Sequence, residues 1–168
     1  MPIVILIGAS GSGKTTIAQA IERRHADVVD VFRFDQIGVP PAEQMIAEYG
    51  SGEEWQRAKT IAWMMKLAHI RKRGRRLLFE GQTRLSSLAA GAVTAGGLPY
   101  LPILIDCDEE TRSRRLRFER QQPEFANETM MNWARWLRRD ASERGCEILD
   151  TSALSLEQCI SLIMARLS

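Results

Sequence analysis

Gly8-Ala-Ser-Gly-Ser-Gly-Lys14-Thr15 is the stretch of sequence that decides the fold. It matches the pattern G-x-x-x-x-G-K-[ST], in which a glycine-rich loop turns successive backbone N–H groups toward a phosphate. Gly8, Gly11 and Gly13 tolerate the unusual dihedral angles and the close approach that such a wrap requires. The stretch therefore predicts a phosphate-binding loop.

The segments on either side of the loop supply the context that this motif needs. Residues 2–7 form a short, β-branched apolar run, which is typical of a strand buried on both faces of a parallel sheet. Residues 14–25 carry Ile17, Ala18 and Ile21 on one helical face. A helix that begins here places its N-terminus at the phosphates, where the macrodipole favours negative charge.

The loop and the first helical turn provide the predicted nucleotide contacts. Lys14 can reach the β- and γ-phosphates, the Thr15 hydroxyl can ligate Mg²⁺, and Thr16 is suited to a further phosphate contact. The alternative is a glycine-rich turn without a ligand, but the flanking strand and helix favour nucleotide binding. The predicted nucleotide-binding residues are Gly8, Ala9, Ser10, Gly11, Ser12, Gly13, Lys14, Thr15 and Thr16.

Outside the loop, strand and helix patterns alternate along the chain. Further strands are expected at 27–34, 77–79, 100–105 and 146–149. Helices are expected between them, with N-terminal caps at Ser51, Asp108, Asn127 and Ser155. This alternation predicts a single α/β domain over 1–168, with a five-stranded parallel sheet between two layers of helices.

The composition is that of an ordinary globular protein. The chain has 168 residues, 45% of them hydrophobic and 26% charged, and its formal net charge is +2. This small charge argues against a nucleic-acid partner. The three cysteines, Cys107, Cys146 and Cys159, are odd in number and widely spaced, so neither a disulfide framework nor a zinc site is expected.

The expected location is the cytoplasm. Free thiols fit a reducing compartment, and the sequence shows neither a signal peptide nor an apolar stretch of membrane-spanning length. We therefore expect no membrane partner. The sequence leaves monomer and homodimer open.

Two classes of nucleotide-binding protein lack their diagnostic motifs here. A GTPase would carry Asn/Thr-Lys-x-Asp and a transporter-type ATPase would carry Leu-Ser-Gly-Gly, and neither motif occurs. The chain is also short for a transporter module or an AAA+ module. What remains resembles the small-molecule kinases of the P-loop class, such as adenylate, shikimate and gluconate kinases. The resemblance implies a nucleotide-kinase-like fold, an acceptor-binding insertion at about 36–74 and a short arginine-bearing lid at about 108–140.

Two acidic residues follow neighbouring predicted strands. Asp35 stands where shikimate and gluconate kinases place an acidic residue against the acceptor hydroxyl, and a carboxylate there can orient the hydroxyl and accept its proton. The alternative is that Asp35 caps the next turn. Glu80 stands where these kinases place the acidic residue that supports Mg²⁺ and its waters.

An arginine follows Glu80 closely. Phe79-Glu-Gly-Gln-Thr-Arg84 looks like the Asp-Gly-Phe-Pro-Arg segment of adenylate kinases, with Glu in place of Asp and Gln-Thr in place of Phe-Pro. In those kinases the arginine holds the acceptor phosphate, so the resemblance makes Arg84 a candidate substrate contact. The alternative is a surface arginine at the start of a helix.

The expected lid is rich in arginine. Arg115-Leu116 followed by Arg120 approximates the Arg-Leu-x-x-Arg of these kinases, with one extra residue. Phosphoryl transfer needs cations around the developing charge, so Arg115 and Arg120 are candidates, with Arg138 and Arg139 in reserve. The alternative is a solvated helix whose arginines pair with nearby glutamates.

Together these features predict transfer of the γ-phosphoryl group of ATP, as its Mg²⁺ complex, to a small-molecule acceptor, with a hydroxyl preferred. Two alternatives stay open: a nucleoside-monophosphate kinase and a non-catalytic nucleotide-binding sensor. The residues predicted to act in catalysis are Lys14, Asp35, Arg115 and Arg120. Those predicted to hold the acceptor are Asp35 and Arg84, and those predicted to hold the metal are Thr15 and Glu80.

Overall fold

Five parallel strands form one sheet in the order β2-β3-β1-β4-β5 in the computed structural model, which describes residues 2–168. Each neighbouring pair of strands runs parallel. The predicted five-stranded parallel sheet is thus confirmed. The strands are β1 (Ile3–Ile7), β2 (Val29–Arg33), β3 (Arg76–Gly81), β4 (Tyr100–Asp106) and β5 (Glu147–Asp150).

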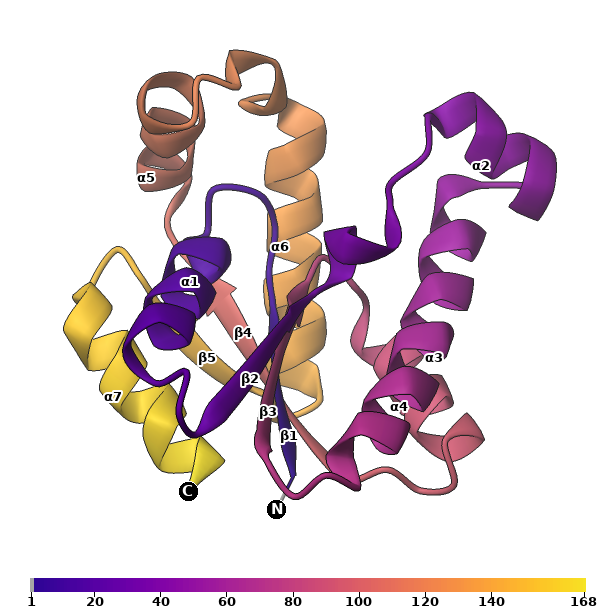
Figure 1. Cartoon of the computed structure of the whole chain (residues 1–168). Helices are drawn as coiled ribbons and strands as arrows, with labels where there is room; N and C mark the ends of the chain where they lie inside the picture. Colours follow the sequence, from indigo (N-terminus) through magenta and orange to yellow (C-terminus); the bar gives the residue numbers. More distant parts are fainter. Residues whose placement is uncertain (1) are drawn as a thin grey trace.

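Helices connect the strands and cover both faces of the sheet (Figure 1). The faces are divided between α1 and α7 on one side and α3, α4 and α6 on the other. The predicted three-layer architecture is therefore confirmed. The α-helices are α1 (Lys14–Arg24), α2 (Ala42–Tyr49), α3 (Gly52–Arg71), α4 (Leu85–Thr94), α5 (Glu109–Arg114), α6 (Glu128–Glu143) and α7 (Leu156–Leu167). Three short helical turns are η1 (Phe34–Ile37), η2 (Arg115–Glu119) and η3 (Pro123–Phe125).

The central strand β1 shows why the chain folds in layers. Successive side chains of a strand point to opposite faces. Ile3, Ile5 and Ile7 accordingly pack with α3, α4 and α6, whereas Val4 and Leu6 pack with α1 and α7. All five are at most 1% exposed. Burial on both faces explains the unbroken apolar run seen in the sequence.

The carboxyl ends of the strands are level at one edge of the sheet. Ile7 lies opposite Gly81, and Arg33 lies opposite Glu80. The loops that leave these strands therefore meet at that edge, which is where open α/β sheets bind ligands. The edge is at the top of Figure 1, with α2 and α5 on either side above it.

The predicted caps form at the helix N-termini. Asp108 accepts a hydrogen bond from the Thr111 backbone N–H at 2.7 Å, and Ser155 and Gln158 exchange both bonds of a capping box. Several strand boundaries differ by one or two residues, and the difference that matters for the site is that β3 continues past 77–79 and includes Glu80. No helix within residues 2–168 is long and apolar enough to cross a bilayer.

Gly91 of α4 packs directly against α3. A Cβ at Gly91 would lie 2.6 Å from Met64 Cγ and 3.3 Å from Ile61 Cα. We expect Gly91→Ala to lower the free energy of unfolding by about 1–3 kcal/mol, because the extra methyl overpacks this contact. Urea unfolding measures the change. Gly52→Ala is the matched control, since its Cβ would meet only Met45 Sδ, at 3.7 Å. Equal stability changes in both variants would contradict the α3–α4 packing.

Candidate functional site

The glycine-rich loop has the backbone that its sequence predicts. A Cβ at Gly8 would lie 2.4 Å from the carbonyl oxygen of Ile105 in the neighbouring strand, so only glycine fits there. Gly13 precedes α1 with φ of 98°, in the left-handed region that favours glycine. The chain thus turns sharply from β1 into α1, and the N-terminus of α1 lies at the edge of the sheet where the carboxyl ends of the strands meet.

Lys14, Thr15 and Glu80 lie together at this edge. Lys14 is 7% exposed and Glu80 is 6% exposed. Desolvation lowers the pKa of Lys14, while the negative charge of Glu80 opposes that shift. Desolvation likewise raises the pKa of Glu80, against the positive charge of Lys14. The Thr15 hydroxyl donates a hydrogen bond to Glu80 Oε1 at 3.3 Å.

The Thr15–Glu80 pair has the chemistry that Mg²⁺ requires. Hydroxyl and carboxylate oxygens are ligands that this cation accepts. Glu80 is a buried carboxylate whose pKa burial raises, and a bound divalent cation would favour its ionised form. Within residues 2–168, no group of three or more His, Cys, Asp or Glu side chains could hold a metal ion. Mg²⁺ is usually held by one or two protein oxygens together with phosphate oxygens and water, and the Thr15–Glu80 pair fits that arrangement.

Two cavities flank Lys14. One, here called the α7-side cavity, has a volume of about 410 Å³ and includes Thr16, Thr151 and Leu156 in its lining. The other, here called the α3-side cavity, has a volume of about 250 Å³. Its lining includes Asp35, Trp55, Gln56, Glu80 and Gln82. Three residues line both cavities: Lys14, Thr15 and Arg120.

Asp35 lies at the α3-side cavity. It is an exposed residue within η1, directly after β2, and β2 pairs with β3. Lys14 and Glu80 line the same cavity as Asp35, so the three groups lie around one space. The residue that caps η1 is Arg33, so Asp35 does not cap that turn. The structure thus brings the two predicted acidic residues together.

Arg120 reaches the site through an irregular turn. α5 ends at Arg114, and η2 continues the helical path to Glu119 as a π turn. The backbone N–H of Arg120 donates to the Arg115 carbonyl at 2.8 Å. A π turn holds one residue more than an α turn. It therefore accommodates the extra residue between Leu116 and Arg120, and Arg120 lines both cavities.

Arg115 contacts the loop backbone. Its guanidinium donates to the carbonyls of Gly11 at 3.3 Å and Ser12 at 3.2 Å, and to Thr151 Oγ1 at 2.8 Å. The Thr151 hydroxyl lies 2.6 Å from the Ser12 carbonyl oxygen and donates to it. Thr151 was not among the predicted residues, because a threonine after the last strand belongs to no recognised motif.

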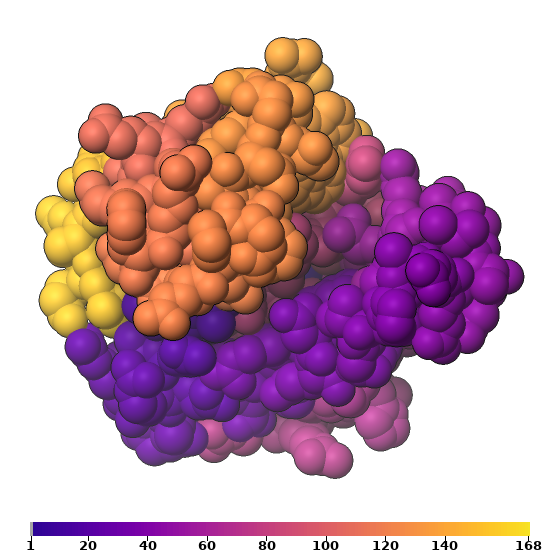
Figure 2. Space-filling view, turned by 90° about the horizontal axis from the view of Figure 1, so that it is seen from above, coloured from indigo at the N-terminus to yellow at the C-terminus, as the bar shows by residue number. Residues whose placement is uncertain are grey.

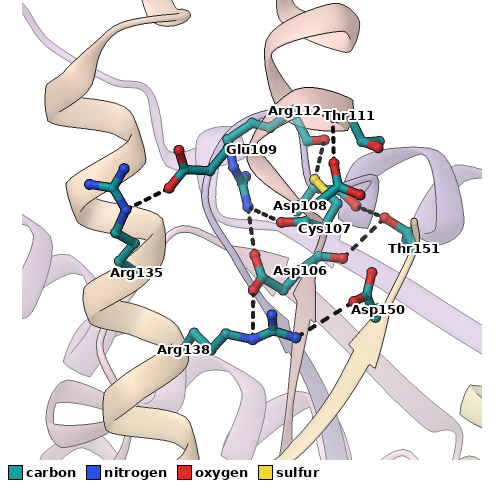
Figure 3. Close-up of polar contacts among 12 residues, drawn as sticks. Asp106, Cys107, Asp108, Glu109, Thr111, Arg112, Arg135, Arg138, Asp150 and Thr151 are labelled. Atoms are coloured by element: carbon teal, nitrogen blue, oxygen red, sulfur yellow. Dashed lines mark hydrogen bonds and ion pairs between the residues drawn. The ribbon is translucent and has the colours of Figure 1, made fainter. Parts of the chain in front are cut away.

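A buried ion pair joins Arg112 to Asp106 next to the loop (Figure 3). Arg112 is fully buried and donates to Asp106 Oδ1 at 2.6 Å and to the Ser10 carbonyl at 2.8 Å. Arg138, one of the reserve candidates, lies 3.3 Å from Asp106 and 3.6 Å from Asp150. Arg138 thus belongs to this supporting network. The other reserve candidate, Arg139, is exposed on α6.

Arg84 lies away from the α3-side cavity. It forms an ion pair with Glu53 at 3.1 Å, and its guanidinium carbon lies 4.5 Å from the ring centre of Trp136. Trp133 and Trp136 are stacked, with ring centres 5.4 Å apart. Gln82, which was not among the predicted residues, lines the α3-side cavity where Arg84 does not. Its Nε2 donates to Ser10 Oγ at 2.6 Å. A lone glutamine gives no sequence signal for such a contact.

Comparison with protein families identifies the class. A family model described as "AAA domain" matches residues 4–131, which is more than half of the chain, so the chain belongs to this family. The chain length had disfavoured an AAA+ module, and this match corrects that expectation. A comparison with curated proteins finds no match.

Solved structures show the same fold. A sugar kinase from Janibacter sp. HTCC2649 is 16% identical, with a TM-score of 0.72 over 98% of this chain and 93% of that one. A gluconokinase from Sinorhizobium meliloti 1021 is 17% identical, with a TM-score of 0.68 over 99% and 91%. A deoxyadenosine kinase from M. mycoides with bound dATP is 14% identical, with a TM-score of 0.66 over 98% of each. The chain thus has the fold of P-loop small-molecule kinases.

The raised pKa of Glu80 makes a prediction about stability. Burial raises this pKa above the ordinary value of 4.5, so the folded chain keeps a proton that the unfolded chain releases. The contribution of Glu80 to the free energy of unfolding therefore falls as pH rises from the ordinary pKa of 4.5 to the raised pKa of the folded chain. Without nucleotide, the Tm of Glu80→Gln should exceed that of the wild type at about pH 7, and the difference should shrink toward about pH 4.

The control for this measurement is Glu43→Gln, which changes an exposed glutamate on α2. Its Tm should follow the wild type at both pH values. A Glu80→Gln variant that is less stable than the wild type at about pH 7 would contradict the argument that desolvation dominates at Glu80.

Proposed function

We propose that this protein is a phosphotransferase that moves the γ-phosphoryl group of MgATP to a hydroxyl of a small molecule. The observation that carries the proposal is the pair of cavities that meet at Lys14, Thr15 and Arg120. A donor in one cavity and an acceptor in the other would bring their reacting atoms to the same cationic junction. The kinase-like fold of the solved neighbours supports this chemistry.

The nucleotide would occupy the α7-side cavity. Its volume of about 410 Å³ is within the range of small-molecule sites. Leu154 and Leu156 provide apolar surface in its lining, against which a base can pack. The phosphates would then follow the loop toward Lys14, with the loop amides and the α1 N-terminus stabilising their charge. Thr15 and Glu80 would hold Mg²⁺, directly or through water, and the cation would neutralise phosphate charge.

The acceptor would occupy the α3-side cavity, with a hydroxyl at Asp35. In transfer, the hydroxyl oxygen forms a bond to the γ-phosphorus while the bond to the β–γ bridging oxygen breaks. ADP leaves, and the hydroxyl proton passes to the Asp35 carboxylate. Lys14 and Arg120 would stabilise the charge on the transferring group, because both line the two cavities.

Two segments would enclose the reaction. We propose that 36–74 binds the acceptor and that 108–140 acts as a lid. Figure 2, which looks down on this end of the molecule, has the segment near residue 45 and the segment near residue 120 on opposite sides of a depression. In this proposal Arg120 acts from the lid on the phosphoryl group. Arg115 positions the loop, since its guanidinium already donates to loop carbonyls.

The surroundings of Arg84 favour a hydroxyl acceptor over a phosphate one. A nucleoside-monophosphate kinase needs a cation that holds the acceptor phosphate. Arg84, the candidate for that role, is paired with Glu53 and packed on two tryptophan rings. A non-catalytic nucleotide sensor remains the contrasting outcome of the experiments below.

Lys14→Ala should remove most of the thermal stabilisation that MgATP gives the wild type. A ligand at a hundredfold excess over its Kd stabilises a protein by about 2.7 kcal/mol, and loss of the phosphate-binding ammonium should abolish most of that gain. A thermal melt with and without MgATP measures it. The control is Lys72→Ala, an exposed lysine just after α3. Full stabilisation of Lys14→Ala would contradict nucleotide binding at the loop.

Asp35→Asn should lower kcat by a factor of about 10² to 10⁴, because an amide cannot accept the hydroxyl proton. Stabilisation by MgATP should stay at the wild-type level. Acceptor-dependent ADP release, screened over nucleosides, sugars, sugar acids and amino alcohols, provides the measurement. The matched control is Asp27→Asn, which changes an exposed aspartate before β2, outside both proposed segments. Undiminished turnover in Asp35→Asn would remove its assignment as base, and absence of turnover with every acceptor would favour the sensor.

A further inference from the structure

A third cavity lies beside the proposed acceptor site. This α6-side cavity has a volume of about 370 Å³, and it lies between the start of α3, the segment after β3 and the start of α6. Gln56 and Gln82 line both this cavity and the α3-side cavity, so the two spaces adjoin. The residues that line it are Gly52, Glu53, Gln56, Gln82, Arg84, Phe125, Asn127, Thr129, Met130 and Trp133.

The boundary between the two cavities is polar but uncharged. Gln56 Nε2 donates to the Gln82 carbonyl at 2.7 Å, and Gln82 Nε2 donates to Ser10 Oγ at 2.6 Å. These bonds fix both glutamines relative to the phosphate-binding loop. A ligand that crosses this boundary therefore meets amide groups, which can donate to and accept from hydroxyl or amine groups.

The far wall of the α6-side cavity is apolar and aromatic. Phe125 is 41% exposed although it is a large apolar side chain. Trp133 is held by its stack on Trp136, with the ring planes only 6° apart. Met130 adds an adaptable thioether to the same lining. Such a wall suits a planar or apolar group, since aromatic contacts stabilise binding beyond the buried area alone.

The cations that line the two cavities each face another negative charge. The cation of the α6-side lining is Arg84, which Glu53 neutralises at 3.1 Å. The cations of the α3-side lining are Lys14 and Arg120, which also line the nucleotide side. An acceptor carboxylate or phosphate would therefore compete with Glu53 or with the nucleotide phosphates for these cations, and it would meet the negative charge of Asp35.

We infer that the α3-side and α6-side cavities form one acceptor site, and that its substrate is an uncharged or amine-bearing alcohol with a planar or apolar body. The reactive hydroxyl lies at Asp35, and the body lies against Phe125 and Trp133. The two volumes, about 250 and 370 Å³, together suit a molecule of two linked rings. This inference rests on the proposed function for the position of the hydroxyl.

Three probes separate the effect of charge from that of the planar body. 4-Methylumbelliferyl glucoside carries a sugar and a planar group, its glucuronide analogue adds a carboxylate, and glucose lacks the planar group. We expect the glucoside to bind at least about tenfold more tightly than either of the others. Anisotropy of the coumarin measures the two aryl glycosides, and competition measures glucose. Equal affinity for glucoside and glucuronide, or no binding of the glucoside, would overturn the inference.

Two exposed phenylalanines provide a matched pair of variants. Phe125 lines the α6-side cavity, whereas Phe118 is 75% exposed on η2 and lines none of the four cavities described within residues 2–168. Phe125→Ala should weaken glucoside binding by about tenfold and leave glucose binding unchanged, while Phe118→Ala changes neither. Trp133→Ala should act like Phe125→Ala. An equal loss in Phe118→Ala and Phe125→Ala would overturn the assignment of the distal wall.

Glu53→Gln tests whether the Arg84–Glu53 pair disfavours acidic acceptors, because the variant should bind an acidic probe more tightly. The substitution removes the partner of Arg84 and leaves its guanidinium free to meet a carboxylate. Affinity for the glucuronide should rise by about tenfold, with affinity for the glucoside unchanged. An unchanged glucuronide affinity would show that Arg84 does not set the charge preference. These are binding measurements without turnover, so they can fail while MgATP-dependent transfer succeeds, and the reverse.

Discussion

Two opposite charges are buried in the lining of one cavity, Lys14 at the start of α1 and Glu80 in β3, and the rest of the site depends on this constraint. The parallel register places Leu6 of β1, the strand that leads into the loop before Lys14, opposite Glu80 of β3. Burial disfavours both charges, lowering the pKa of Lys14 and raising that of Glu80. Each charge opposes the shift of the other only in part, because desolvation is the largest cause of both shifts. Phosphate oxygens against Lys14 and a divalent cation against Glu80 would both offset this desolvation, so the site favours a nucleotide with its metal.

The charged groups around the loop have separate roles. Arg112 and Arg115 donate to carbonyls of the loop and so fix its backbone. Arg120 lines both cavities, because the π turn after α5 places it next to Lys14 and Thr15, where the two cavities meet. A helical segment with several arginines thus both supports the loop and places one cation in the lining of both cavities. The supporting arginines are bonded to the backbone, which fixes their geometry more firmly than exposed ion pairs would.

Most of the fold could be predicted from the sequence, because its signals are local. The phosphate-binding motif, the apolar strand runs and the capping residues each depend on neighbours within a few positions. Asp35 and Glu80 were predicted to be close because they follow neighbouring strands, and they line one cavity. The surroundings of Arg84 could not be predicted, since Glu53 and Trp136 are brought to it only by tertiary packing. The π turn at Arg115 was likewise hidden, because no residue pattern distinguishes it from an α-helix.

The central claim is that a phosphoryl group crosses from one cavity to the other at Lys14, Thr15 and Arg120. The most direct test gives the protein MgATP with an isotope-labelled γ-phosphate together with a mixture of neutral and amine-bearing hydroxyl compounds. Mass spectrometry then follows the label. The account predicts that the label leaves ATP and is recovered as a phosphate ester on one of these compounds. Label that stays on ATP, or is recovered entirely as inorganic phosphate, would contradict it.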